Sequence, residues 1–146
     1  MGPERAMKIV RAAFAICMLS LLPAGPAIAG DPVEAAQSVI TSQIEAFLHN
    51  DAAEAYAFAS PTIRQKFPDE ATFFDMVKRG YAPVYRPGNF AFGRSKVTGS
   101  TVLQEVLING SDGKDWTAIY QVVRQPDGSY KINGVHMMRS AAGSDI

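Results

Sequence analysis

The hydrophobic periodicity of this 146-residue chain changes once, at Gly80, and that change limits which folds the chain can adopt. Between residues 31 and 80, apolar residues recur at steps of three and four, which is typical of amphipathic helices. From residue 90 to residue 138, short runs rich in β-branched and aromatic residues are typical of strands. Helices followed by strands predict an α+β fold, in which N-terminal helices pack on one face of a curved antiparallel sheet.

Each predicted helix begins at a residue whose side chain can accept a hydrogen bond from a free backbone N–H group. The first helix is predicted over residues 31–48, and three shorter helices begin at Asp51, Ser60 and Asp69. We expect Gly80 to end the last helix, because glycine readily adopts the left-handed conformation that closes many helices.

The second half of the chain predicts four strands, over residues 90–97, 101–108, 116–124 and 130–138. Short turn sequences separate them, and such connections join neighbouring antiparallel strands, so we expect a meander. The dipeptide Asn133-Gly134 interrupts the last run and predicts a β-bulge.

The first 29 residues have the three parts of a secretory signal peptide. A basic region precedes the apolar run Ala12–Leu22, whose 11 residues are too few to span a bilayer. A stretch of small residues ends at Ala29, so we expect cleavage between Ala29 and Gly30. This predicts a periplasmic or secreted protein in which residues 30–146 form a single α+β domain.

The composition of residues 30–146 excludes several classes of function. The one cysteine, Cys17, lies in the signal segment, so the mature chain is cysteine-free and cannot use thiol chemistry. Its 11 basic and 13 acidic residues give a net charge of −2, which argues against nucleic-acid binding. We expect no membrane contact after signal cleavage, and two isolated histidines without a glycine-rich phosphate loop predict neither metal nor cofactor.

Three segments resemble a known family: AFLHNDAAEAYAFASPTIRQKF at 46–67, MVKRGYAPVYRP at 76–87 and DGSYKINGV at 127–135. Together they are similar to a bacterial family catalogued as domain of unknown function 4864, over about residues 39–138. The resemblance implies the nuclear transport factor 2-like superfold, which includes SnoaL-like cyclases, ketosteroid isomerase and members without catalysis. It therefore implies a cone-shaped sheet with a cavity at its open end, and it assigns no catalytic residue.

The corner GYAPVYRP supplies most of the candidate ligand-binding residues. We expect its two prolines to bend the chain into the first strand and so to fix Tyr81, Tyr85 and Arg86 at the cavity mouth. The guanidinium of Arg86 would then bind a carboxylate or phosphate. From the strands, we expect Tyr120 and His136 to line the same cavity, which suits a partly apolar ligand.

The last strand also allows an enzymatic interpretation. Strict alternation places His136 on the same face as Tyr130 and Ile132, where it could act as a base beside a cavity tyrosine. No carboxylate is identifiable to orient it, so we assign no catalytic residue. Glu105 is the one acid inside a strand run, and we expect it to face solvent because the other face of its strand is more apolar.

Three functions remain open from the sequence. The favoured one is non-catalytic binding of a small, partly apolar ligand or a protein partner in the cavity. The alternatives are a cofactor-free isomerase, dehydratase or cyclase that uses His136, and a structural homodimer module whose cavity is filled. The dimer is suggested because residues 116–123 are partly apolar on both faces, whereas a sheet with helices on one side usually has a polar outer face.

Overall fold

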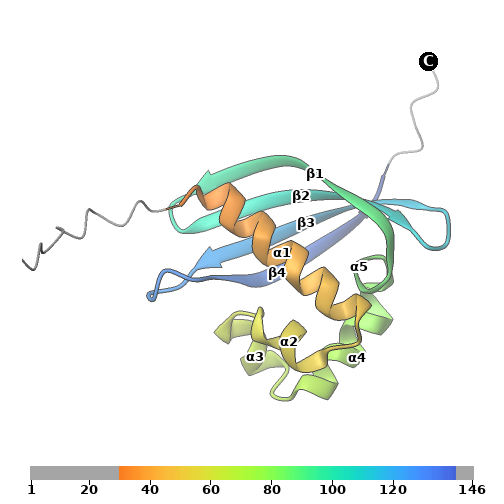
Figure 1. The fold of residues 1–146 in the computed structure, drawn as a ribbon, viewed down its shortest axis with the longest axis horizontal. Helices are drawn as coiled ribbons and strands as arrows, with labels where there is room; N and C mark the ends of the chain where they lie inside the picture. The colour runs from red at the N-terminus through yellow and green to blue at the C-terminus, as the bar shows by residue number, and fades with distance from the viewer. Residues whose placement is uncertain (1–29, 141–146) are drawn as a thin grey trace, which may run out of the picture.

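The computed structural model describes residues 30–140, so the predicted signal segment lies outside the described residues. Within them, helices come first and strands second, which confirms the predicted α+β fold (Figure 1). The elements are α1 (Pro32–Leu48), α2 (Ala52–Ala57), α3 (Pro61–Lys66), α4 (Glu70–Gly80), α5 (Ala82–Tyr85), β1 (Pro87–Thr98), β2 (Thr101–Gly110), β3 (Asp115–Arg124) and β4 (Tyr130–Arg139).

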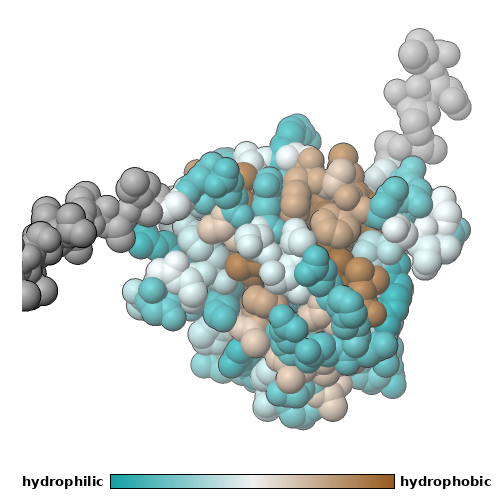
Figure 2. Space-filling model, in the orientation of Figure 1, coloured by the Kyte–Doolittle hydropathy of each residue, from teal (hydrophilic) through white to brown (hydrophobic). Residues whose placement is uncertain are grey.

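The helices occupy one side of the sheet. The long helix α1 crosses this face, and α2, α3 and α4 lie together beside its C-terminal half, near β4 (Figure 1). Apolar side chains reach the surface beside α1, above β1 and near α5 (Figure 2). In residues 30–140 no helix has both the length and the apolar character needed to cross a membrane.

The four predicted helix starts are confirmed by capping hydrogen bonds. The side chains of Asp31, Asp51, Ser60 and Asp69 each accept a hydrogen bond from a backbone N–H two or three residues further on, at 2.7–3.3 Å. These bonds satisfy donors that have no partner inside the helix. The prediction for Gly80 is half right: α4 ends there, but Gly80 does not take the left-handed conformation.

The corner after α4 contains a short helix that the sequence did not predict. Pro83 lies in the first turn of α5, where its missing N–H group costs nothing because N–H groups of the first turn have no partner inside the helix. Val84 is buried, and the chain then enters β1 at Pro87, three residues before the predicted strand start. The two prolines therefore bend the chain by starting a helix and a strand in quick succession.

The sheet is an antiparallel meander with strand order β1-β2-β3-β4, as predicted. The predicted bulge is confirmed in β4: Gln121 lies opposite Gly134 and Val122 lies opposite Ile132, so Asn133 is an extra residue. An extra residue reverses the alternation of side chains between the two faces. Val135 consequently lies on the helix side of the sheet.

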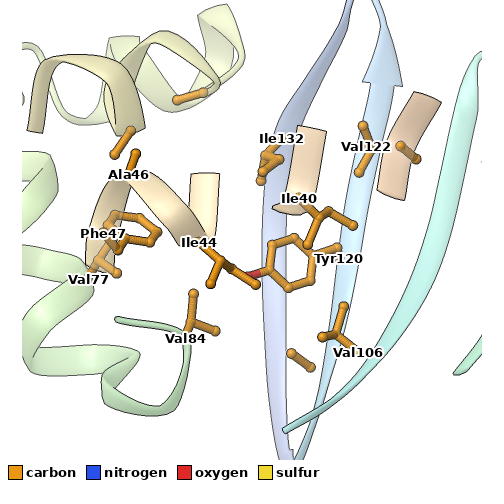
Figure 3. Close-up of a cluster of buried hydrophobic side chains, with 14 of the residues drawn as sticks. Ile40, Ile44, Ala46, Phe47, Val77, Val84, Val106, Tyr120, Val122 and Ile132 are labelled. Atoms are coloured by element: carbon orange, nitrogen blue, oxygen red, sulfur yellow. The ribbon is translucent and has the colours of Figure 1, made fainter. Parts of the chain in front are cut away.

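The core lies between α1 and the helix side of the sheet (Figure 3). Ile40 and Ile44 of α1 are fully buried, as are Val106 and Val122 of the sheet. Each such side chain stabilises the fold by about 1.5–3 kcal/mol through removal of its apolar surface from water. This layer fixes α1 on the sheet and so determines where the other helices can pack.

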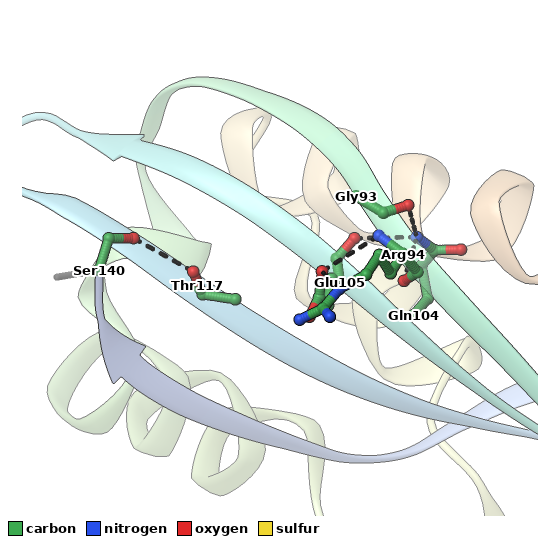
Figure 4. Close-up of polar contacts among 6 residues, drawn as sticks. All are labelled: Gly93, Arg94, Gln104, Glu105, Thr117 and Ser140. Atoms are coloured by element: carbon green, nitrogen blue, oxygen red, sulfur yellow. Dashed lines mark hydrogen bonds and ion pairs between the residues drawn. The ribbon is translucent and has the colours of Figure 1, made fainter. Parts of the chain in front are cut away.

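The opposite side of the sheet, here called the open face, is not covered by a helix in the described residues. It presents Leu103, Leu107 and Met138, which are 39–46% exposed. Glu105 lies on this face, as expected, and pairs with Arg94 at 2.8 Å (Figure 4). The hydrogen bond from Arg94 holds the pKa of the Glu105 carboxyl below its usual range.

Candidate functional site

A cavity of about 300 Å³ lies between β4 and the helices α1, α3, α4 and α5. Its lining is mostly apolar, and its principal members are Phe47, Phe67, Phe73, Val77, Val84 and Ile132. Its size lies at the lower end of the range of small-molecule sites in proteins, which are usually apolar with a few polar groups. The cavity is therefore large enough for a small organic molecule.

Aromatic side chains pack against one another in the helical wall of this cavity. Phe73 of α4 stacks against Phe47 of α1 with ring centroids 6.3 Å apart, and it meets Phe67 edge-on at 6.5 Å. Tyr56 contacts the same ring at 5.5 Å. Such ring pairs stabilise a packing arrangement beyond their simple burial, so the wall resists collapse into the cavity.

The bulge of β4 forms the opposite wall. Its extra residue, Asn133, accepts a hydrogen bond from the Ser60 hydroxyl at 2.7 Å and donates one to the Gln121 side chain at 2.9 Å. Both Asn133 and Gly134 line the cavity. Bulges often occur beside functional sites because they re-aim side chains and interrupt strand pairing.

Few polar groups face the cavity. Gln43 of α1 is 3% exposed and donates its amide N–H to the Ala55 carbonyl at 3.1 Å, which leaves its amide oxygen for another donor. Lys66 stands at the end of α3 with an exposed side chain, and it is the one charged residue among the described residues of the lining. The lining includes neither a carboxylate nor a histidine from the described part of the chain.

Of the candidates in the GYAPVYRP corner, Tyr81 lines the cavity and the other two do not. The Arg86 guanidinium stacks on the Tyr85 ring, 4.0 Å from its centroid, and donates to the Asn50 side chain at 2.6 Å. It also donates to the Phe47 carbonyl. The Tyr85 hydroxyl donates to the same Asn50 oxygen at 2.8 Å. Tyr85 and Arg86 thus link the corner to the C-terminal end of α1. Their polar groups form hydrogen bonds within the protein rather than facing the cavity.

Tyr120 is completely buried beneath α1 and does not line the cavity. Its hydroxyl is directed from the sheet toward the helices, beside Ile44 and Val84 (Figure 3). No hydrogen-bond partner for this hydroxyl occurs among residues 30–140. Burial raises the pKa of the Tyr120 hydroxyl well above its ordinary value, because the charged form would lose its hydration.

His136 lies on the open face, opposite Ile119, and is exposed. The expectation that it shares a face with Ile132 is wrong, because the extra residue at Asn133 reverses the alternation between them. His136 therefore does not meet the geometric requirement of the enzymatic interpretation.

Sequence reasoning missed three polar residues of the lining: Gln43, Lys66 and Asn133. Each of them carried a partial signal. Gln43 directly precedes Ile44 of the apolar stripe, and Asn133 forms the bulge that the sequence predicted. Lys66 belongs to a segment, residues 64–96, whose seven basic and three acidic residues indicate an anion-attracting surface, but its place at the cavity depends on how α3 packs against β4.

Among the described residues, no cluster of three or more histidine, cysteine, aspartate or glutamate side chains is placed to hold a metal ion. Residues 31–144 match the family model of a domain of unknown function (DUF4864). No curated protein and no solved structure is significantly similar to the chain.

Proposed function

Because the chain belongs to the family of the domain of unknown function (DUF4864), whose description assigns no activity, we propose a function from the cavity itself. The protein binds a small, mostly apolar molecule between β4 and the helices and does not transform it. The observation that carries this proposal is the cavity of about 300 Å³ with its apolar lining. Apolar surface in contact with water favours a ligand that displaces the water, by roughly 25 cal/mol for each Å² that becomes buried.

The lining favours binding over catalysis. Proton-transfer enzymes need a base within hydrogen-bond reach of the substrate, and this base is most often histidine or a carboxylate. The described part of the lining supplies neither, and His136 lies on the other side of the sheet. A cofactor-free isomerase, dehydratase or cyclase is therefore the less favoured alternative.

The proposal includes export and a place among the nuclear transport factor 2-like folds. The composition of residues 1–29 supports export to the periplasm or the medium. Helices packed on one face of a curved antiparallel meander, with a cavity between β4 and the helices, support the fold assignment. A fold shared by enzymes and binding proteins does not decide between them, so the choice rests on the cavity.

Native mass spectrometry of the protein recovered after export tests the proposal. We expect a bound small molecule on the natural protein and its loss in Val135→Phe, whose larger side chain enters the cavity from β4. Val123→Phe is the matched control, because it makes the same substitution on the open face. Ligand-free protein in every preparation, or a bound molecule that Val135→Phe retains, would contradict the proposal.

A second candidate function is a homodimer formed through the open face. Five large apolar side chains of residues 30–140 are exposed, and Leu103, Leu107 and Met138 of this face are three of them. A second copy placed against this face would remove them from water. Sedimentation equilibrium should then show a dimer that Leu107→Glu dissociates, whereas a monomer at high protein concentration would exclude it.

A further inference from the structure

We infer that the ligand of this cavity is an amphiphile with a single negative charge, whose head group pairs with Lys66 while its tail fills the apolar interior. The inference rests on the proposed function and names the chemical class of its ligand. It follows from the charge of the lining, from the engagement of the neighbouring cations, and from the volume of the cavity.

The charge of the lining is a single exposed cation beside an apolar interior. Lys66 has no carboxylate beside it in the lining, and the ion pairs of residues 30–140 are Arg79–Asp75 and Arg94–Glu105. An ammonium group at the edge of an apolar cavity favours a ligand with one anionic end, because the head group remains partly in water while the tail is buried.

The neighbouring cations are engaged elsewhere. Arg64 and Lys131 both donate to the Ala57 carbonyl, at 3.1 Å and 2.8 Å. Their side chains line a separate groove on the other side of α3. Arg86 is held by Asn50 and the Phe47 carbonyl. Lys66 is thus the cation that the fold leaves for a ligand at this cavity.

The volume limits the tail. At roughly 30 Å³ for each water-sized group, the cavity of about 300 Å³ holds about ten non-hydrogen atoms. Nonanoate is close to this size, and 1-octanol and octylammonium have the same octyl tail with a neutral and a positive head group. These three molecules therefore separate the contribution of the tail from that of the charge.

The test is a titration of the purified protein with each of the three molecules at low ionic strength. Binding is monitored by NMR through the amide chemical shifts of Ile132–Val135 in the cavity wall. We expect nonanoate to bind about two- to fivefold more tightly than 1-octanol, which is the contribution of an exposed ion pair. The preference should disappear at about 0.5 M salt, where charges are screened over a few Å.

Charge reversal supplies the sharper measurement. Lys66→Glu should weaken nonanoate binding and strengthen octylammonium binding, while 1-octanol binding stays unchanged. Lys114→Glu, in the exposed turn between β2 and β3, makes the same change in net charge away from the cavity and should leave the order of affinities as it is. Lys66→Gln should abolish the preference without reversing it.

The outcomes separate the inference from the function on which it rests. Equal affinities for the three molecules, or a preference for octylammonium in the natural protein, would overturn the anionic head group while leaving the apolar site intact. The same holds if Lys114→Glu changes the order as much as Lys66→Glu does. If none of the three molecules shifts the Ile132–Val135 amides, the proposed function fails and the inference fails with it.

Discussion

Replacing Tyr120 by phenylalanine should make the protein more stable. The Tyr120 side chain is completely buried, and its hydroxyl has no hydrogen-bond partner among residues 30–140. A buried polar group without a partner costs about 1–3 kcal/mol of folding free energy, because it gave up its hydrogen bonds to water. Phenylalanine keeps the ring and its packing beside Ile44, so Tyr120→Phe should recover that free energy.

The magnitude is measurable by urea unfolding followed through the fluorescence of Trp116, the one tryptophan in the chain. The midpoint should rise while the slope of the unfolding free energy against urea stays the same, since the surface exposed on unfolding is nearly unchanged. A gain of 1 kcal/mol corresponds to a rise in melting temperature of roughly 3–6 °C for a domain of this size.

Tyr56→Phe is the matched control, because its hydroxyl donates to the Phe67 carbonyl at 2.7 Å. The same chemical change should cost about 0.5–1.5 kcal/mol there. The two substitutions should therefore shift stability in opposite directions. If Tyr120→Phe is as destabilising as Tyr56→Phe, the Tyr120 hydroxyl is hydrogen-bonded in the native protein, and the prediction is wrong.

Arg86→Lys should lower the unfolding free energy, measured in urea, by about 1.5–3 kcal/mol. Lysine cannot donate to both the Asn50 side chain and the Phe47 carbonyl as the guanidinium does. An unchanged urea midpoint would contradict the prediction. Burial raises the pKa of Tyr120 in the native protein. The Tyr120 hydroxyl therefore loses its proton near pH 10 in the unfolded chain, but only at higher pH in the native protein. The unfolding free energy should therefore fall above that pH, by about 1.4 kcal/mol per pH unit, and Tyr120→Phe should lose less stability over the same range in urea titrations. Deleting Asn133 should destabilise the fold and reduce binding at the cavity, because it removes the bulge and the hydrogen bonds of Asn133 with Ser60 and Gln121, while the register keeps Val135 on the helix side. Unchanged thermal melting would show that the bulge is dispensable.

Local chemistry made most of the fold predictable. The caps at Asp31, Asp51, Ser60 and Asp69 depend on a hydrogen bond to a residue two or three positions away, so the sequence contains both partners. The strand order follows from short turns for the same reason. The short helix α5 was missed because the prolines were interpreted as helix breakers, whereas Pro83 is compatible with a first turn.

The site was predictable only in part, because the partners of its side chains lie far apart in the sequence. Arg86 looked like an anion-binding residue, yet the ends of its guanidinium meet Asn50 and the Phe47 carbonyl, more than thirty residues earlier. Tyr81 lines the cavity as expected. The excess of basic residues over 64–96 includes Lys66, but its place beside the cavity depends on where α3 packs, which no local pattern contains.

The contacts of β4 with the segment between α2 and α3 cover part of the sheet edge and also determine where the cavity lies. The segment between α2 and α3 pairs with β4 through Ile132, which donates to the Phe58 carbonyl at 2.8 Å and accepts from the Ser60 amide at 2.9 Å. This pairing covers an edge that would otherwise invite association with another strand. It stops at the bulge, where Asn133 binds the Ser60 hydroxyl instead of extending the pairing. Beyond that point β4 and the helices separate, and the space between them is the cavity. The position of one extra residue therefore determines where edge protection ends and where the cavity begins.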